Sequence, residues 1–331
     1  MNEDILNEIK NQLDWEEREK KLIKLLDKHR SKNGDYDWMF SHAQVPFGYL
    51  LDEKTLRIYY ATRDNDNRCI ATFIEVDPKN PSEIKYVHND ICLGLGDLGM
   101  FDERGAMISC IVKHHDLLYM YYTGWNIAVD TPYRLSIGLA ISDDGGLKFK
   151  KHSSGPIMDR SIYDPAYCCT PYVLKIDGKW KMWYLSGVRW KTINKHPEPF
   201  YHVKYAESKD GIYWVRKGHI SLDFSDEIDA IGNHTVVFED NIYKMYYSYR
   251  KATEDYRTNP ESAYRLGYAL SKDGITFNPR NDLFELRGDR EPWEKIMNAY
   301  PRIYDHEDKR YIFYNGNGFG KSGFGYAVSK K

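Results

Sequence analysis

The stretch Leu118-Tyr-Met-Tyr-Tyr-Thr-Gly-Trp125 has four counterparts elsewhere in the 331-residue sequence. They are Leu56-Arg-Ile-Tyr-Tyr-Ala-Thr-Arg63, Trp180-Lys-Met-Trp-Tyr-Leu-Ser-Gly187, Tyr243-Lys-Met-Tyr-Tyr-Ser-Tyr-Arg250 and Arg310-Tyr-Ile-Phe-Tyr-Asn-Gly-Asn317. The third positions of the five copies, which we call the anchors, are Ile58, Met120, Met182, Met245 and Ile312. The anchors are spaced by 62, 62, 63 and 67 residues, and so even a spacing indicates an internal repeat.

Each copy is aromatic and apolar between turn-forming residues, which is typical of a buried strand. A second apolar run precedes each copy and is joined to it by a short polar connection such as Asp177-Gly-Lys179, so each pair predicts a β-hairpin. A third apolar run follows in repeats two to five, and in three of them an Asp-Gly turn leads to a fourth strand. One repeat is therefore a predicted meander of four strands.

Four-stranded meanders repeated around an axis build a β-propeller, whereas a linear solenoid would need polar capping repeats at its ends. The sequence thus predicts an all-β, five-bladed β-propeller over residues 34–331. Because the chain ends after the third strand of repeat five, we expect residues 34–41 to supply the fourth strand of that blade.

Residues 1–33 are predicted to form an N-terminal helical extension. Ile5, Ile9 and Leu13 follow helical spacing, and Asp14 with Glu17 resembles a capping box that begins a second helix. We expect these helices to pack on the side of the propeller, with a homo-oligomer contact as the alternative.

The charge balance of 47 basic and 49 acidic side chains gives a net charge of −2, which provides no electrostatic case for binding nucleic acid or an anionic membrane. No run approaches the ~20 apolar residues that span a bilayer, and the N-terminus is acidic where a secretory signal is basic. We therefore expect a cytoplasmic protein. Five cysteines without Cys-x-x-Cys spacing favour free thiols, and we predict no metal site and no cofactor.

Equivalent positions of the repeats should converge at the mouth of the propeller. Eighteen residues before the anchors, four of the five repeats carry a carboxylate: Asp102, Asp164, Glu227 and Glu294. Crowded carboxyls differ in pKa, and such a pair suits glycoside cleavage by an acid and a base or nucleophile. The alternative is that these residues cap turns before the first strand of each repeat.

Polar and aromatic residues near the same positions suit a carbohydrate ligand. The candidate substrate-binding residues are His42, Gln44, Arg63, Arg104, Asn233, His234 and Asn298. The candidates for stacking on sugar rings are Trp125, Tyr167, Trp190 and Tyr300, with core packing as the alternative for each. For Arg63, a structural ion pair with Asp64 is equally compatible with the sequence.

Several stretches together resemble the five-bladed β-propeller glycosidases, the group that contains glycoside hydrolase families 32, 43, 68 and 130. These stretches are Ser41-His-Ala-Gln-Val-Pro46, Phe101-Asp-Glu-Arg-Gly105, Asp164-Pro165, Thr170-Pro171, Asp226-Glu227, Trp293-Glu-Lys-Ile-Met-Asn-Ala-Tyr-Pro301 and Tyr314-Asn-Gly-Asn-Gly-Phe-Gly-Lys-Ser-Gly-Phe-Gly-Tyr326. The resemblance spans residues 36–331 and is greatest to cytosolic propellers encoded among bacterial surface-polysaccharide genes. Where those families place their acids, this chain has Gln44, Ala106 and Cys168.

Three hypotheses of function follow. The first is an enzyme that hydrolyses or transfers a glycosyl unit, with Glu227 as proton donor, Asp164 as orienting group or base, and Asp102 and Glu294 as base or hydroxyl ligands. The second is a non-catalytic sugar-binding or scaffolding propeller in polysaccharide biosynthesis. The third is a glycoside phosphorylase, which needs a basic phosphate pocket; Arg104, Arg189 and Lys191 are too scattered in the sequence to predict one.

Overall fold

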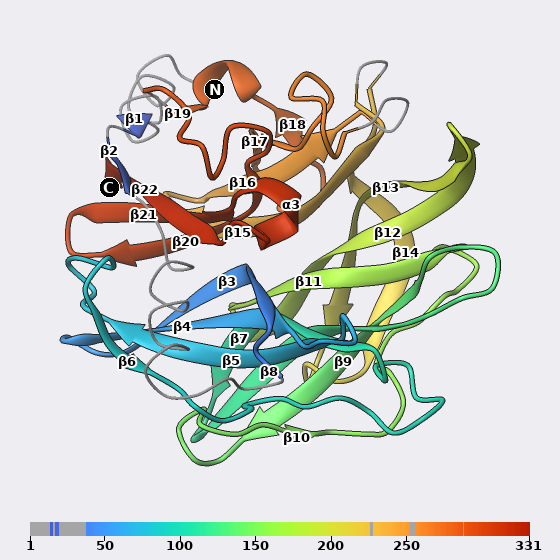
Figure 1. Cartoon of the computed structure of the whole chain (residues 1–331), viewed down its shortest axis with the longest axis horizontal. Helices are drawn as coiled ribbons and strands as arrows, with labels where there is room; N and C mark the ends of the chain where they lie inside the picture. The colour runs from blue at the N-terminus through green and yellow to red at the C-terminus, as the bar shows by residue number, and fades with distance from the viewer. Residues whose placement is uncertain (1–13, 16, 20–37, 226–227, 252–255, 287) are drawn as a thin grey trace.

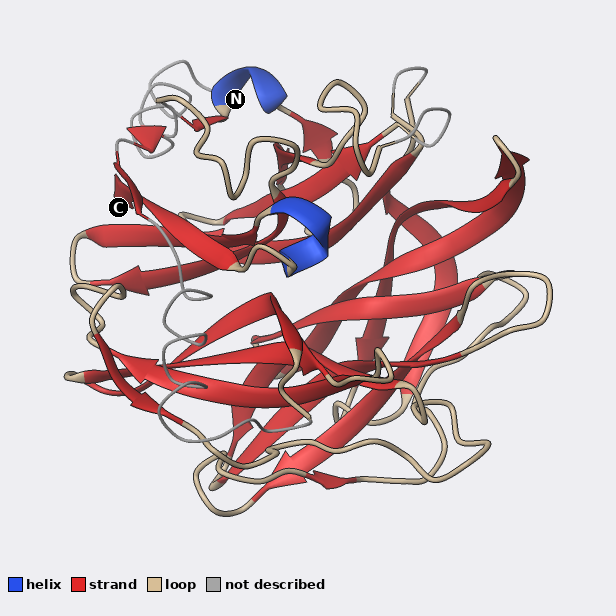
Figure 2. Cartoon of the chain, viewed as in Figure 1, coloured by secondary structure: helices blue, strands red, loops and turns tan. Residues whose placement is uncertain are grey.

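The computed structural model of the chain describes residues 14–15, 17–19, 38–225, 228–251, 256–286 and 288–331. Strands dominate these residues, with only short helical turns at Asn281–Leu283 (η1) and Asn317–Gly320 (α3) (Figure 2). The predicted all-β class is confirmed. Within these ranges, no helix has both the length and the apolar character that crossing a membrane requires.

Apart from a short pair of strands, β1 (Asp14–Trp15) and β19 (Glu285–Leu286), the described strands form five antiparallel units of four strands, which we call meanders (Figure 1). Single parallel bridges, Cys69–Gly105 and Tyr201–Ala230, join the first meander to the second and the third to the fourth. The first comprises β3 (Ser41–Asp52), β4 (Thr55–Arg63), β5 (Cys69–Val76) and β6 (Ile84–Val87). The second comprises β7 (Gly105–His114), β8 (Leu117–Asn126), β9 (Arg134–Ser142) and β10 (Lys150–Lys151). The third comprises β11 (Tyr167–Ile176), β12 (Lys179–Ile193), β13 (His196–Ser208) and β14 (Trp214–Leu222).

The fourth meander comprises β15 (Ala230–Glu239), β16 (Ile242–Arg250), β17 (Arg265–Ser271) and β18 (Asn278–Pro279). The fifth comprises β20 (Ala299–His306), β21 (Lys309–Asn315), β22 (Phe324–Lys330) and β2 (Glu17–Glu19). The predicted repeat lies in the second strand of every meander, and all five anchors are 0% exposed. Since both faces of these strands are covered, their sequences are apolar almost without interruption.

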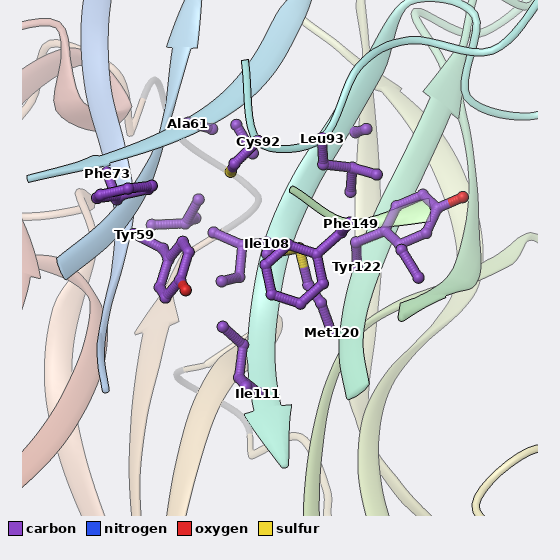
Figure 3. Packing of buried hydrophobic residues seen from close by; sticks show 14 of the residues in the cluster. Tyr59, Ala61, Phe73, Cys92, Leu93, Ile108, Ile111, Met120, Tyr122 and Phe149 are labelled. Atoms are coloured by element: carbon purple, nitrogen blue, oxygen red, sulfur yellow. The ribbon is translucent and has the colours of Figure 1, made fainter. Parts of the chain in front are cut away.

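Hydrophobic clusters lie between neighbouring meanders. Figure 3 shows the cluster between the first and second meanders, where Tyr59, Phe73, Ile108, Met120 and Phe149 pack together. We call the boundary between two neighbouring meanders a seam. Burial of these side chains at the seam stabilises the contact between the two meanders.

A repeated hydrogen bond also joins neighbouring meanders. The aromatic residue after the anchor donates to the glycine carbonyl of the next meander's turn, at 2.8–2.9 Å, in the pairs Tyr59–Gly146, Tyr121–Gly211 and Trp183–Gly274. Each of these glycines has a positive φ, a conformation that glycine adopts without steric cost. The Asp-Gly turns predicted from the sequence are thus also docking points between meanders.

The first and fifth meanders are in direct contact. The Val45 amide donates to Asn315 Oδ1 at 3.0 Å, and the Tyr311 hydroxyl donates to the Lys79 carbonyl at 3.0 Å. Ile58 and Tyr60 of β4 share a buried cluster with several aromatic residues of the fifth meander. The two ends of the repeat array therefore meet.

The expected donor of the last strand is wrong. Glu17–Glu19 pairs antiparallel with β22, whereas Ser41 pairs with Arg63 and the Phe40 amide donates to the Arg63 carbonyl, both within the first meander. Residues 34–37 lie outside the described residues. An unpaired edge strand needs a partner for its backbone groups, and an N-terminal segment supplies it.

The helix predicted to begin at Asp14 is also wrong for the residues that the structure describes. Asp14–Trp15 forms β1, which pairs parallel with β19 (Glu285–Leu286), and Glu17–Glu19 forms β2. A helix cap formed by Asp14 and Glu17 would contribute only a modest stabilisation. The backbone hydrogen bonds that β1 forms with β19 and β2 forms with β22 outweigh it. The remainder of the predicted extension, residues 1–13, 16 and 20–33, lies outside the described residues.

Candidate functional site

The first strands of the five meanders are each interrupted by a bulge or register shift. The interruptions lie between Gln44 and Phe47, Ile108 and Cys110, Cys169 and Tyr172, Gly232 and Thr235, and Ala299 and Arg302. At least one residue from each bulge lines a single cavity of about 400 Å³: Val45, Ser109, Thr170, Asn233 and Tyr300. Corresponding parts of the repeats therefore do converge, but these residues stand eleven to thirteen positions before the anchors rather than eighteen.

Four of these bulge residues have left-handed backbone conformations: Val45 (φ 51°), Thr170 (φ 43°), Asn233 (φ 50°) and Tyr300 (φ 66°). For residues other than glycine this conformation costs on the order of 1–3 kcal/mol, and such strain concentrates at functional sites. The Thr170 amide donates to Thr123 Oγ1 at 2.9 Å, and the Tyr300 amide donates to Ser248 Oγ at 2.6 Å. Each of these hydrogen bonds comes from the preceding meander and helps to hold the strained backbone.

Aromatic side chains form much of the cavity wall. They are Trp125, Tyr133, Tyr167, Trp190, Tyr201, Tyr256, Tyr264, Tyr300 and Phe319. The hairpin of β12 and β13, which extends on the right of Figure 1, supplies Trp190, Pro197 and Pro199. Trp190 packs edge-on against Tyr133 with ring centroids 5.1 Å apart. All four residues predicted to stack on sugars lie in this wall.

Three arginines, Arg63, Arg250 and Arg257, also line the cavity, and no carboxylate does so among the described residues. Arg257 forms an ion pair with buried Glu198, with Nη1 and Oε1 2.6 Å apart. The charge of the described wall is therefore positive.

Three of the predicted substrate-binding residues, Gln44, Arg63 and Asn233, line this cavity. Arg63 Nη2 donates to Gln44 Oε1 at 3.3 Å, and Gln44 Nε2 contacts Cys69 Sγ at 3.1 Å. Asp64 pairs with Arg68 at 2.7 Å, so the ion pair considered for Arg63 does not form. Arg63 is thus available to the cavity.

The other four predicted substrate-binding residues do not line the cavity. Arg104 Nη2 donates to the Asp66 carbonyl at 2.9 Å, and the Asn298 side chain donates to Glu294. Burial lowers the pKa of His234 to about 3. Burial, together with the charges of Arg63 and Lys321, lowers the pKa of His42 to about 3, so both imidazoles are neutral at pH 7.

The three predicted carboxylates that the structure describes are buried away from the cavity. Asp164 accepts hydrogen bonds from Ser186 Oγ at 2.7 Å, Ser161 Oγ at 2.9 Å and Arg216 Nη1 at 2.8 Å. Asp102 accepts a hydrogen bond from the Tyr122 hydroxyl at 2.8 Å, and Lys151 Nζ lies 2.6 Å from the same Oδ2 atom.

Glu294 is fully buried and accepts a hydrogen bond from Asn298. None of Asp102, Asp164 and Glu294 lines the cavity. The hydrogen bonds of Asp102 and Asp164 come from side chains rather than from turn amides, so the turn-capping alternative does not describe these two residues either. Glu227 lies outside the described residues. In the part of the chain that the structure describes, no three His, Cys, Asp or Glu side chains form a group that suits a metal ion.

Several cavity residues were missed by the sequence analysis, among them Arg250, Tyr133, Tyr201, Tyr256 and Tyr264. The repeat itself contained a usable signal for Arg250. Arg63, Trp125 and Arg250 all stand five residues after an anchor, at or near the end of a second strand, and all three line the cavity.

Comparison with solved structures identifies the fold as the β-propeller of glycoside hydrolases. A protein described as "Glycoside hydrolase" matches with a TM-score of 0.70 and 15% identity, covering 94% of this chain and 96% of that chain. The Bombyx mori GH32 β-fructofuranosidase BmSUC1 matches with a TM-score of 0.60 and 14% identity, covering 99% and 67%. A thermostable family-43 glycoside hydrolase matches with a TM-score of 0.59 and 15% identity, covering 88% and 89%.

At these identities the similarity concerns the fold alone. A search against protein-family models finds no match. The chain is 32% identical over 298 residues to two Mycobacterium tuberculosis proteins, Uncharacterized protein MT1551 (strain CDC 1551 / Oshkosh) and Uncharacterized protein Rv1502 (strain ATCC 25618 / H37Rv), with 89% of this chain and 95% of each relative covered. The chain belongs to the same family as these proteins.

Proposed function

We propose that the protein is a five-bladed β-propeller that binds a carbohydrate in the central cavity. The observation that carries this proposal is the convergence of one bulge residue from each of the five first strands on that cavity. The volume of about 400 Å³ is within the usual range for small-ligand sites. Contact between the first and fifth meanders supports a closed ring of five blades.

The cavity wall has the chemistry that sugars require. The exposed faces of Trp125 and Trp190 offer flat apolar surfaces for the C–H face of a pyranose ring. Gln44, Thr170 and Asn233 offer donors and acceptors for hydroxyl groups. Asn233 Oδ1 is buried and has no hydrogen-bond partner, so a ligand hydroxyl would satisfy it.

A second candidate function is glycosyl hydrolysis or transfer, which the similarity of the fold to glycoside hydrolases favours. General acid–base chemistry needs a carboxyl at the sugar, and the described wall contains none. Of the four predicted carboxylates, Glu227 lies outside the described residues, and its role as proton donor stays a prediction. The three arginines of the wall also favour the phosphorylase hypothesis, because they supply the cationic groups that a phosphate co-substrate needs.

We also propose that the protein works in a reducing compartment such as the cytoplasm. All five cysteines are free and buried, and Cys69 lies in the cavity wall. Burial raises the pKa of the Cys69 thiol, which keeps it protonated and unreactive at pH 7.

Calorimetric titration with a panel of monosaccharides and oligosaccharides, neutral and charged, tests the proposal. We expect Trp190→Ala to weaken binding by about tenfold or more, because it removes a stacking surface. The matched control is Tyr213→Ala, since Tyr213 is 78% exposed and lies outside the cavity wall. No binding across the panel, or equal binding by the wild type and the Trp190 variant, would contradict the proposal.

The same samples, analysed for reaction products with and without phosphate, separate binding from catalysis. Binding without products supports a sugar-binding or scaffolding propeller. Products that disappear in Glu227→Gln, while binding is retained, support the hydrolase, and products that form only with phosphate support phosphorolysis.

A further inference from the structure

The cavity wall holds two arginines, Arg63 and Arg250, that pair with no carboxylate in the part of the chain that the structure describes. Arg63 ends β4 in the first meander and Arg250 ends β16 in the fourth, at the same position of the repeat. Neither forms an ion pair with an acidic side chain among the described residues, whereas Arg257 pairs with Glu198 in the same wall. A cation in a partly dry wall is unfavourable unless an anion compensates it.

Among the described residues, the groups that hold Arg250 in place are neutral. Its side chain is 1% exposed, its guanidinium lies 3.8 Å from the centre of the Tyr256 ring, and Nη2 donates to the Pro199 carbonyl at 3.1 Å. Nε donates to the Tyr264 hydroxyl at 3.2 Å. These contacts fix the guanidinium without neutralising it, so its positive potential extends into the cavity.

Arg63 is less buried and retains an unused donor. Nη1 donates to Asn67 Oδ1 at 2.8 Å and Nη2 to Gln44 Oε1 at 3.3 Å, which fixes the plane of the guanidinium. Its Nε is buried and has no hydrogen-bond partner. A buried donor without a partner in a cavity wall indicates a group that a ligand satisfies.

We propose that the carbohydrate bound in this cavity is anionic and that its phosphate or carboxylate group pairs with Arg63. The positive charge of Arg250 adds to the electrostatic attraction of the cavity for this group. This inference rests on the proposed function. A planar guanidinium matches a phosphate or carboxylate through paired hydrogen bonds, and such charge-assisted bonds are stronger than neutral ones. A neutral sugar would leave both charges uncompensated.

The test is calorimetric titration with glucose, galactose and mannose, each as the neutral sugar, the 6-phosphate and the uronic acid. We expect at least one anionic form to bind about tenfold or more tightly than its neutral parent, which corresponds to one charge-assisted hydrogen bond. Comparison of the phosphate and uronate arms identifies the anionic group. Added NaCl is expected to weaken the binding of the anionic form only.

Arg63→Gln is expected to reduce the affinity for the anionic form to that of the neutral sugar, while Arg63→Lys keeps part of the difference. The control is Arg134→Gln, which removes the same charge from an exposed position between the cavity residues Tyr133 and Leu135. Thermal unfolding of each variant shows that it is folded.

The outcomes for the two proposals differ. Equal binding of neutral and anionic forms, or an anionic preference that survives in Arg63→Gln, would overturn the anionic-ligand inference and leave carbohydrate binding intact. Failure of every sugar to bind would overturn the proposed function itself.

Discussion

Asp164 and Asp102 occupy the same position of successive repeats and have equivalent surroundings. Each contacts the hydroxyl of the tyrosine two residues after its anchor, Tyr184 or Tyr122, at 3.2 and 2.8 Å. Each also contacts a cation on the fourth strand of its own meander, Arg216 or Lys151. These carboxylates therefore tie the loop before the first strand to the outer strand, which is a structural role that repeats with the fold.

Asp164→Asn tests this structural role. The substitution removes the negative charge opposite Arg216 and Lys204, which are both largely buried, so we expect the free energy of unfolding to fall by about 3–5 kcal/mol. Urea denaturation measures this change. Asp143→Asn, at an exposed position, is the control and is expected to change stability by less than about 0.5 kcal/mol. If Asp164→Asn instead keeps the stability of the wild type but no longer binds sugar, Asp164 has a role in ligand binding.

Asp102 and Asp164, which the sequence predicts as part of a shared site, lie outside the cavity wall, and there is a physical reason for it. A residue type that recurs in most repeats can serve what the repeats share, namely the connection of their strands. The bulge residues Val45, Ser109, Thr170, Asn233 and Tyr300 line the cavity but share no residue type. A search for one recurring residue type finds the first set and misses the second, although Gln44, Arg63 and Asn233 were found from their polarity.

At the scale of strands, the sequence predicts the second strands best. The anchors of these strands are fully buried, so the run of apolar residues alone is enough to identify the strands. The N-terminal segment was mispredicted because β2 is stabilised by backbone pairing with β22, more than three hundred residues away in the sequence, and its Glu17-Arg-Glu19 side chains carry no strand pattern. Non-local pairing of this kind leaves no local signal.

A buried ion cluster joins two meanders, and we expect it to make the stability of their contact depend on pH. Arg310 on β21 contacts Glu239 on β15 and Asp305 on β20, with Nη2 to oxygen distances of 2.7 and 2.8 Å. Burial alone would raise the pKa of Glu239. Hydrogen bonds and charges from Arg310 and Lys244 outweigh burial and lower the pKa from its ordinary value of 4.5 to about 2.

A carboxyl whose pKa is lowered on folding stabilises the native state above its unfolded pKa and loses that contribution as the pH falls. We therefore expect the contribution of Glu239, on the order of 3 kcal/mol, to be full above about pH 4.5 and to be lost between about pH 4.5 and pH 2. Urea denaturation at several pH values measures it. The Glu239→Gln variant should lose this part of the pH dependence, and the exposed control Glu207→Gln should keep it; a wild-type profile in the Glu239 variant would refute the assignment.

At the scale of the whole molecule, one kind of hydrogen bond recurs at the seams, where neighbouring meanders meet. At three seams a bulge amide donates to the side chain that stands three residues after the anchor of the preceding meander: Thr170 to Thr123, Tyr300 to Ser248, and Val45 to Asn315. The last pair joins residues 270 positions apart and links the fifth meander to the first. The cavity is complete only when this seam is closed, because Val45 and Gln44 come from one side of it and Phe319 from the other.

Asn315→Ala therefore tests closure of the ring, with Thr123→Ala at an internal seam as its matched control. Each substitution removes the side-chain acceptor of one bulge amide, so in a closed ring both should lower the free energy of unfolding by about 1–3 kcal/mol within a single cooperative transition. In an open arc, water would reach the Val45 amide and Asn315→Ala would cost little, while Thr123→Ala would still destabilise. Denaturation curves followed by tryptophan fluorescence and by circular dichroism distinguish the two. Since the closing seam also forms part of the cavity wall, loss of ring closure in Asn315→Ala should be accompanied by loss of sugar binding.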